Sequence, residues 1–519
     1  MEISRIRALR GPNLWTRRTA IEAIVTLSEG ERPLAGMPGF EDRLRERFPE
    51  LGFLRATHKS DTLTLAHALE VAAICLQAQA GCPVTFSRTA KTVQPGVFQI
   101  VVEYSEEAVG RLALQLAEQL CLAARADTPF DLQDALKQLR DLDEDERLGP
   151  STGSIAINRG IPCRRLTGGS LVQMGWGSKQ RRIQAAEVDR TSAIAEAIAQ
   201  DKALTKKLLR AAGVPVPEGR PVHSADDAWT AAQEIGLPVV VKPLDGNQGK
   251  GVTVNLRGEA EIRRAFEVAQ GFRDDILVER YLPGGDYRLL VVGNKLVAAA
   301  RREPPNVRGD GIHSVRELVQ QVNADPRRGE GHATSLTKIR FDEIALSTLE
   351  KQGLHAESIP EKGRRIVLRN NANLSTGGTA TDVTGDVHPE VAARAVEAAQ
   401  MVGLDICGVD VVCDSVLRPL EEQGGGIVEV NAAPGLRMHL SPSFGKARDV
   451  GKAVIDHMFA PGENGRIPVV AVTGTNGKTT TVRLITHLLR TSGLSVGMTN
   501  TDGVYVNAVQ VDSGDCSGP

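Results

Sequence analysis

The chain has 519 residues, of which 41% are hydrophobic and 24% are charged, and its formal net charge is −2. This length suffices for roughly three or four domains, and the near-neutral charge argues against a basic surface for nucleic acid. The 7 cysteines contain no CxxC pair, so reduced thiols are expected and a disulfide framework or zinc site is not. Without a signal-peptide core or an apolar run of about 18 residues, the sequence predicts a cytoplasmic protein with no membrane partner.

Residues 1–160 predict an α+β domain that mixes amphipathic helices with an alternating strand. HALEVAAICLQAQA (67–80) and EEAVGRLALQLAEQLCLAA (106–124) have helical periodicity, whereas GVFQIVVEY (96–104) alternates as a strand does. The acidic stretch DLDEDERLGPSTG (141–153) ends this region and reads as a surface connection. From 161 to 462 short apolar strands alternate with helices and glycine-rich loops, which is an α/β pattern.

A glycine-rich segment in this second region is suited to phosphates. LPVVVKPLDGNQGKGV (237–252) predicts a strand that ends at Lys242 and is followed by Gly246, Gly249 and Gly251. Glycines let a loop fold over phosphates without obstruction by side chains. A glycine-rich hairpin with a surface lysine is the alternative interpretation of this segment.

Acidic residues further along the chain complete a predicted Mg-ATP site. GVDVVCD places Asp410 in the middle of a strand, where a carboxylate is costly to bury unless a metal or cation satisfies it. IVEVNAAPG places Glu429 and Asn431 two residues apart, so both point to one face of a sheet. Three oxygen ligands of this kind suit Mg²⁺, with ATP phosphates in the remaining positions.

The segment VAVTGTNGKTTTVRLI (470–485), which follows the linker PGENGRIP, predicts a strand, a phosphate-binding turn and a helix. Backbone amides and the helix N-terminus would hold the anion, Lys478 would reach its charge, and the Thr479 hydroxyl could hold Mg²⁺. It is not a strict Walker loop, because Gly474 takes the place of a glycine expected at position 472. Residues 463–519 are therefore predicted to form the start of a third, P-loop domain.

The order of the central motifs resembles the ATP-grasp superfamily, whose ligases convert a carboxylate into an acyl-phosphate that an amine then attacks. The resemblance implies that Asp410, Glu429 and Asn431 bind two Mg²⁺ ions. It also implies the following ATP contacts: Lys202, Lys242 and Gly249 at the phosphates, Glu279 and the Tyr281 backbone at adenine, and Asp286 at the ribose.

One position departs from the pattern of this superfamily. D-alanine ligases have an arginine two residues before the metal-binding aspartate, but this chain has Gly408 there. The cation that stabilises the acyl-phosphate charge is therefore expected elsewhere. Arg288 is the first candidate and Arg301 the second, and a surface salt bridge is the alternative for either.

The terminal loop TGTNGKT resembles that of Mur ligases, and the match covers Gly474, Asn476, Gly477, Lys478 and Thr479. An ATP-grasp region followed by such a loop, together with RGPNLWTRRTAIEA and NLSTGGTATDVT, resembles the cyanophycin synthetase family. The resemblance implies an ATP-dependent polymerase of L-aspartate and L-arginine. Its ATP-grasp site would add aspartate to the C-terminal carboxyl of the primer, and its Mur-like site would join arginine to the aspartate side chain.

The same resemblance implies further roles and partners. The amino-terminal domain would hold the cyanophycin polymer, and the protein would be a homo-oligomer, a tetramer in the family. Ser151 and Ser375 would lie near the terminal carboxylate of the primer, although a turn or helix cap is equally compatible with these serines. Only 41 residues follow Lys478, so the Mur-like part is expected to be truncated. Two alternatives remain: another ATP-grasp ligase of the glutathione-synthetase type, or a polymer-binding module without turnover.

Overall fold

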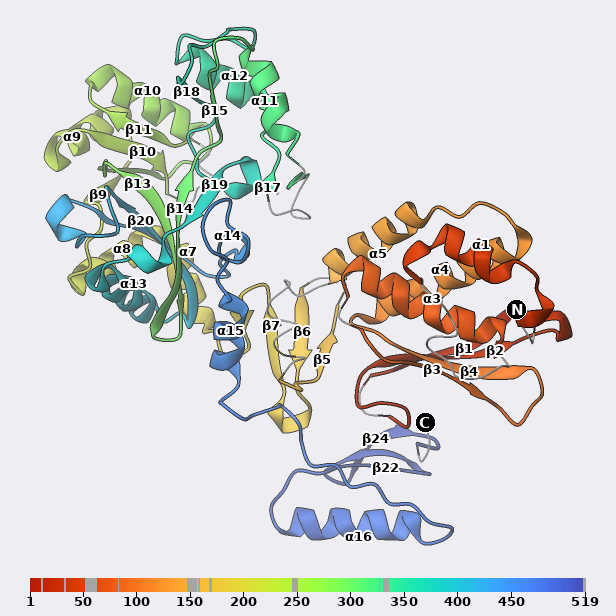
Figure 1. Cartoon of the computed structure of the whole chain (residues 1–519). Helices are drawn as coiled ribbons and strands as arrows, with labels where there is room; N and C mark the ends of the chain where they lie inside the picture. Colours follow the sequence, from red (N-terminus) through yellow and green to blue (C-terminus); the bar gives the residue numbers. More distant parts are fainter. Residues whose placement is uncertain are drawn as a thin grey trace. The chain divides into compact units, whose positions relative to one another are not determined.

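A computed structural model describes residues 1–10, 13–31, 34–51, 63–82, 84–146, 156, 159–167, 170–244, 251–325, 327–329 and 336–516. Two of the predicted site residues, Ser151 and Gly249, lie outside these ranges. The chain forms two compact units, one of residues 1–175 with 180–465 and the other of residues 176–179 with 466–519 (Figure 1). Among the described helices, none is both long and apolar enough to cross a membrane.

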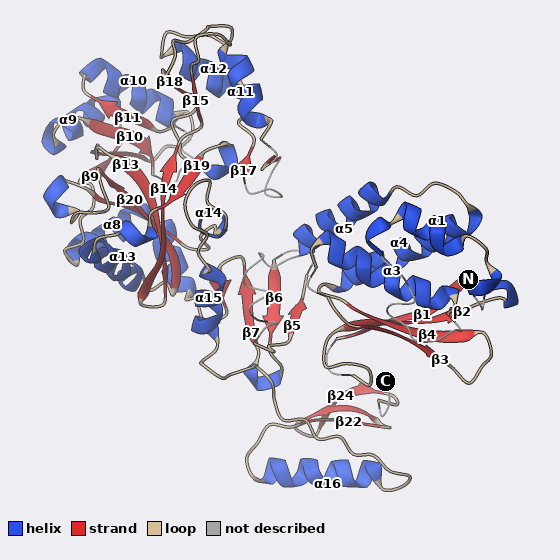
Figure 2. Ribbon diagram, viewed as in Figure 1, coloured by secondary structure: helices blue, strands red, loops and turns tan. Residues whose placement is uncertain are grey.

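The amino-terminal region is an α+β module, as predicted. Its strands form an antiparallel sheet in the order β1-β2-β4-β3, and its helices lie on one face of that sheet (Figure 2). Leu69 and Leu76 of one helix, Leu114 of another and Ile100 of the sheet meet in the core. The elements are β1 (Glu2–Leu9), β2 (Ala20–Thr26), α1 (Phe40–Arg47), α3 (Leu65–Ala80), β3 (Ser87–Lys91), β4 (Val97–Glu103), α4 (Glu107–Ala126) and α5 (Leu132–Glu146).

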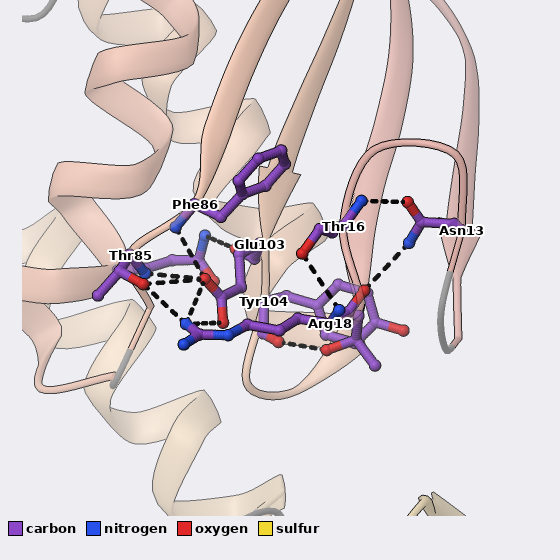
Figure 3. A network of polar contacts seen from close by, with 9 residues as sticks. Asn13, Thr16, Arg18, Thr85, Phe86, Glu103 and Tyr104 are labelled. Atoms are coloured by element: carbon purple, nitrogen blue, oxygen red, sulfur yellow. Dashed lines mark hydrogen bonds and ion pairs between the residues drawn. The ribbon is translucent and has the colours of Figure 1, made fainter. Parts of the chain in front are cut away.

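A buried carboxylate anchors the loop between β1 and β2. Glu103 is 5% exposed. Its side chain accepts hydrogen bonds from the backbone N–H groups of Thr85 and Phe86, at 2.9 and 2.8 Å, and pairs with Arg18 at 3.0 Å (Figure 3). The Asn13 amide donates to the Arg18 carbonyl at 3.0 Å. Because a buried charge needs partners, this part of the RGPNLWTRRTAIEA segment has a structural role.

A small antiparallel sheet, β5-β6-β7-β8, and two helices lead into the central region. These elements are β5 (Cys163–Arg165), β6 (Leu171–Met174), β7 (Arg181–Gln184), β8 (Glu187–Val188), α7 (Ala193–Gln200) and α8 (Lys202–Ala211). Asp201 starts α8, because its side chain accepts hydrogen bonds from the N–H groups of Ala203 and Leu204. This cap fixes the position of Lys202 in the first turn.

The central region contains two larger antiparallel sheets. The first has the order β11-β10-β12-β9 and packs against α9 and α10. Its elements are β9 (Gly219–Val222), α9 (Ala225–Ile235), β10 (Val239–Pro243), β11 (Thr253–Leu256), α10 (Glu259–Gln270) and β12 (Ile276–Arg280). The second has the order β19-β14-β13-β20-β21. Its elements are β13 (Gly285–Val292), β14 (Lys295–Glu303), β19 (Thr379–Asp382), β20 (Ile406–Cys413) and β21 (Gly426–Asn431).

Helix α13 (Pro389–Val402) covers one face of the second sheet, where Leu289, Val409 and Val430 are buried. A smaller group of elements is inserted between β14 and β19 (Figure 1). It consists of β15 (Asn306–Arg308), α11 (Val315–Asn323), β16 (Arg328–Gly329), β17 (Leu336–Thr337), α12 (Glu343–Glu350) and β18 (Arg365–Val367). Helices α14 (Arg437–Leu440) and α15 (Val450–Met458) follow β21.

The second unit contains α16 (Lys478–Thr491) and the antiparallel sheet of β22 (Gly497–Asn500), β23 (Gly503–Val506) and β24 (Val509–Ser513). The helix begins at Lys478, as predicted, but the strand predicted before the loop is wrong. The residues around Val470 are irregular, and Val469 and Val470 are 72% and 63% exposed. A strand needs a neighbour to accept its ladder hydrogen bonds, and the described strands of this unit pair only with one another.

Candidate active site

Strand register gathers acidic and basic side chains on the face of the second sheet opposite α13. Asp410 on β20 lies directly across from Arg288 on β13 and from Glu429 on β21. Asp286 on β13 lies across from Arg302 on β14. Because side chains alternate along a strand, these positions share one face.

The arginines and aspartates of this face form a buried ion-pair cluster. Arg288 pairs with both carboxylate oxygens of Asp410, with Nη2 at 3.1 Å from Oδ2. Arg302 bridges the two acids, with Nη2 at 3.0 Å from Asp410 Oδ2 and Nε at 3.0 Å from Asp286 Oδ1. Asp410 is only 5% exposed. Burial acts to raise its pKa, but the charges of Arg288 and Arg302 outweigh that effect and hold the pKa below its usual range.

Arg302 was not predicted from the sequence as a site residue. The structure also corrects the prediction of Arg301 as the second candidate for the stabilising cation. Arg301 lies across from Tyr287, on the opposite face, and its half-exposed side chain approaches Glu303 at 3.5 Å. The register of β13 and β14 shifts between Leu290 and Val291, so one extra residue enters β14. A regular hairpin would have placed Arg301 opposite Asp286, and the irregularity brings Arg302 there.

The position of Gly408 explains how Arg288 enters the cluster. A Cβ atom at Gly408 would lie 2.9 Å from both Cδ and Nη1 of Arg288, and 3.0 Å from Cβ of Pro434. The Arg288 side chain therefore passes over Gly408, the position that was compared with the arginine of D-alanine ligases. The guanidinium beside Asp410 is therefore supplied by Arg288 of the neighbouring strand, β13, and not by position 408.

A second cluster combines two lysines with one glutamate. Glu279 on β12 is 3% exposed, and its two carboxylate oxygens pair with Lys242 of β10 and Lys206 of α8. Burial would raise the Glu279 pKa, but both lysines lower it. Burial and the charge of Lys242 lower the pKa of Lys206 to about 8. Lys206 was not predicted, although its spacing of four residues from Lys202 on one helix face was a usable signal.

Helix α8 joins the two clusters. Lys202 Nζ lies 3.1 Å from Glu429 Oε1, and Lys206 is one turn further along the same helix. A small hollow of about 10 Å³ lies between α8 and β21 and is lined by Lys202, Lys206 and Glu429, among others. Cations suited to a triphosphate thus reach from the first sheet to the acids of the second.

The acids fit Mg²⁺ only as part of a larger ligand set. Among the described residues, no three His, Cys, Asp or Glu side chains come together as a metal-binding group. Asp410 and Glu429 face each other, and the Asn431 amide nitrogen donates to the Gly408 carbonyl at 3.3 Å, which leaves the amide oxygen as a possible ligand. Two carboxylates and one amide oxygen are hard donors that suit Mg²⁺ when phosphate and water oxygens complete the shell.

The remaining predicted residues of the first unit, Tyr281 and Ser375, lie in two separate places. The Tyr281 backbone N–H donates to the Pro238 carbonyl at 3.0 Å. Ser375 belongs to a short turn, Leu374–Thr376. After that turn, a Cβ at Gly378 would lie 2.9 Å from the Glu303 carbonyl, so the segment abuts the end of β14. Their contacts with ATP or primer stay predictions.

In the second unit, the glycine turn brings the predicted loop residues together at the start of α16. Lys478 Nζ donates to the carbonyls of Gly474 and Thr475, at 2.8 and 3.4 Å. Gly474 and Gly477 have φ angles of 147° and 79°, which only glycine adopts readily. Asn476 lies within the turn, and Thr479 lies in the first turn of the helix.

Comparisons with known proteins place relatives over the whole chain. The cyanophycin synthase-like N-terminal domain family matches residues 24–125, and the RimK-like ATP-grasp domain family matches residues 199–311. A cyanophycin synthetase from Nostoc sp. is 43% identical over an alignment of 540 positions, which covers 100% of this chain and 60% of that protein. The chain thus spans about 60% of the length of such relatives.

Proteins of glutathione biosynthesis match a smaller part of the chain. A bifunctional glutathione biosynthesis protein from Clostridium perfringens is 36% identical over 317 positions, which cover 59% of this chain and 40% of that protein. The solved structure of a bifunctional glutathione synthetase from Pasteurella multocida has 30% sequence identity and a TM-score of 0.47. It covers 66% of this chain and 49% of that chain.

Proposed function

We propose that this chain, which is homologous over its whole length to the cyanophycin synthetases, is an ATP-dependent ligase that adds L-aspartate to the C-terminal carboxyl of a cyanophycin primer. The observation that carries the proposal is the buried cluster in which Arg288 and Arg302 both contact Asp410, with Glu429 across the sheet. Such a cluster supplies two guanidiniums for a carboxylate and a phosphoryl group, beside oxygen donors for Mg²⁺.

The lysines of the site would position ATP. Lys242 and Lys206, which pair with Glu279, would bind the phosphates when ATP enters. Lys202 lies beside Glu429 on the other side of the site. Asp410, Glu429 and Asn431 would hold Mg²⁺, which supplies neutralising charge to the phosphates when it is bound. Contacts of Glu279 and Tyr281 with adenine, and of Asp286 with the ribose, belong to the same proposal.

The arginines would stabilise the charge that develops during activation. A primer carboxylate oxygen attacks the γ-phosphorus of ATP, and the bond from that phosphorus to the ADP oxygen breaks. Arg288 and Arg302 donate hydrogen bonds to the oxygens of the resulting acyl-phosphate. The amine nitrogen of aspartate then attacks the carbonyl carbon, phosphate leaves with the electron pair of the C–O bond, and the amine proton passes to solvent. Ser375 would hold the primer end.

The glycine turn before α16 supports a second addition in the whole protein. Gly474, Asn476, Gly477, Lys478 and Thr479 would bind the phosphates of another ATP molecule, in a Mur-like domain that joins L-arginine to the aspartate side chain. A cytoplasmic homo-oligomer, and an amino-terminal domain that holds the polymer, complete this proposal.

The test is a mass measurement of a synthetic β-Asp-Arg primer after incubation with ATP, Mg²⁺ and aspartate. We expect one added aspartyl residue and ADP release that requires both primer and aspartate. A parallel reaction with γ-glutamylcysteine and glycine tests the glutathione-type alternative, which the Clostridium perfringens relative suggests. ADP release in that reaction alone would overturn the proposal, and so would failure in both reactions.

A further inference from the structure

A cavity of about 440 Å³ lies along β19 at the edge of the second sheet, and its lining residues have no part in the proposed reaction steps. Its lining includes Arg327, Arg328, Leu336, Thr379, Ser443 and Phe444. Thr379 precedes Ala380, which lies directly across the sheet from Arg302. The Ser443 hydroxyl accepts a hydrogen bond from the Ala380 N–H at 3.0 Å. The cavity therefore opens next to the strand that carries Arg302.

Two arginines meet at Thr337, the neighbour of Leu336 in the lining, and one of them, Arg328, belongs to the lining itself. Arg437 of α14 donates to the Thr337 hydroxyl at 3.0 Å, and Arg328 donates to the Thr337 carbonyl at 2.6 Å. Arg328 is 9% exposed, and burial lowers the pKa of both guanidiniums from their ordinary value. Arginines retain their charge even so, and a partly desolvated guanidinium binds a carboxylate strongly. The acid in the lining, Asp325, already pairs with Arg327 at 2.8 Å.

A buried histidine lies on the same short helix as Arg437. His439 is 3% exposed, and its Nε2 atom has no hydrogen-bond partner among the described residues. Burial, followed by the charge of Arg288, lowers the pKa of His439 to about 3, so the ring is neutral at physiological pH. Helix α14 packs against β14, the strand that carries Arg302. An unpaired ring nitrogen at this depth is costly unless a ligand satisfies it.

We propose that the cavity is the binding site of the attacking amino acid. Arg437 and Arg328 bind its carboxylates, and His439 accepts a hydrogen bond from its amine. Two guanidiniums match the two carboxylates of aspartate, which makes this pocket a determinant of specificity for an acidic amino acid. The same charges disfavour the cationic arginine side chains of the primer. The inference rests on the proposed function and names the place of its second substrate.

Hydroxylamine allows activation of the primer to be measured separately from binding of aspartate. It attacks an acyl-phosphate and gives a hydroxamate without occupying an amino-acid pocket. The full chain is given primer and ATP with either hydroxylamine or aspartate. Arg437→Gln should raise the KM for aspartate roughly tenfold or more, the loss of a charge-assisted hydrogen bond. Hydroxamate formation and the primer KM should stay within about twofold of the wild-type values.

His439→Gln is the second variant, and it should lower aspartate addition while hydroxamate formation persists. Arg394→Gln is the matched control, because Arg394 lies on α13 and pairs with Glu397 and Glu421. An unchanged aspartate KM in both pocket variants would overturn the inference, and so would a rise in the primer KM. A wild-type chain that forms no primer-dependent hydroxamate would overturn the proposed function itself.

Discussion

Replacing Gly408 with alanine tests whether the position of the Arg288 side chain controls the rate of the reaction. The added Cβ would lie 2.9 Å from Cδ and Nη1 of Arg288, whereas ordinary contacts begin at 3.4 Å. Pro434 Cβ, at 3.0 Å, restricts movement of the new methyl group. The arginine side chain must therefore shift by about half an ångström or more, which disturbs its paired hydrogen bonds with Asp410.

The expected loss follows from that displacement. A misplacement of about 1 Å costs on the order of a hundredfold in rate, so we expect kcat to fall by about 10- to 100-fold in Gly408→Ala. The overpacking should also cost about 1–3 kcal/mol in the free energy of unfolding. The assay is primer- and aspartate-dependent ADP release per folded protein, with urea unfolding measured in parallel.

Gly385→Ala is the matched control, because a Cβ at Gly385 meets no atom within 4 Å. It should retain wild-type turnover to within about twofold, since surface substitutions of this kind are nearly neutral. If Gly408→Ala matched this control in turnover, the guanidinium of Arg288 would tolerate displacement, and its proposed role in the reaction would be refuted.

Three further outcomes are expected. Asp410→Asn and Glu429→Gln should each remove more than nine-tenths of aspartate-dependent ADP release, a barrier increase above about 1.4 kcal/mol, and smaller losses would show that the acids are misassigned. Lys242→Met should abolish the same activity, while exposed Lys295→Met should not, and equal activities in this assay would remove Lys242 from the ATP site. Glu103→Ala should lower the free energy of unfolding, measured in urea, by about 1–3 kcal/mol, because the backbone N–H groups of Thr85 and Phe86 lose their acceptor. An unchanged unfolding curve would contradict the anchoring role.

Local patterns in the sequence were enough to predict much of this protein. The helical periodicity of residues 67–80 and 106–124 predicted α3 and α4, and the glycine turn before Lys478 predicted the start of α16. The spacing of Glu429 and Asn431 predicted their shared face on one strand. These features depend on residues close in the chain, where helix and strand periods dictate which side chains face together.

Other features depend on contacts between distant segments, and only the tertiary structure decided them. The segment before the glycine turn has strand composition, but a strand also needs a partner, and none of the described strands pairs with it. The choice between Arg301 and Arg302 depends on one extra residue in β14, because a shift of one position turns every following side chain to the other face. The convergence of Arg437 and Arg328 on Thr337 joins segments about a hundred residues apart, whose approach no local pattern encodes.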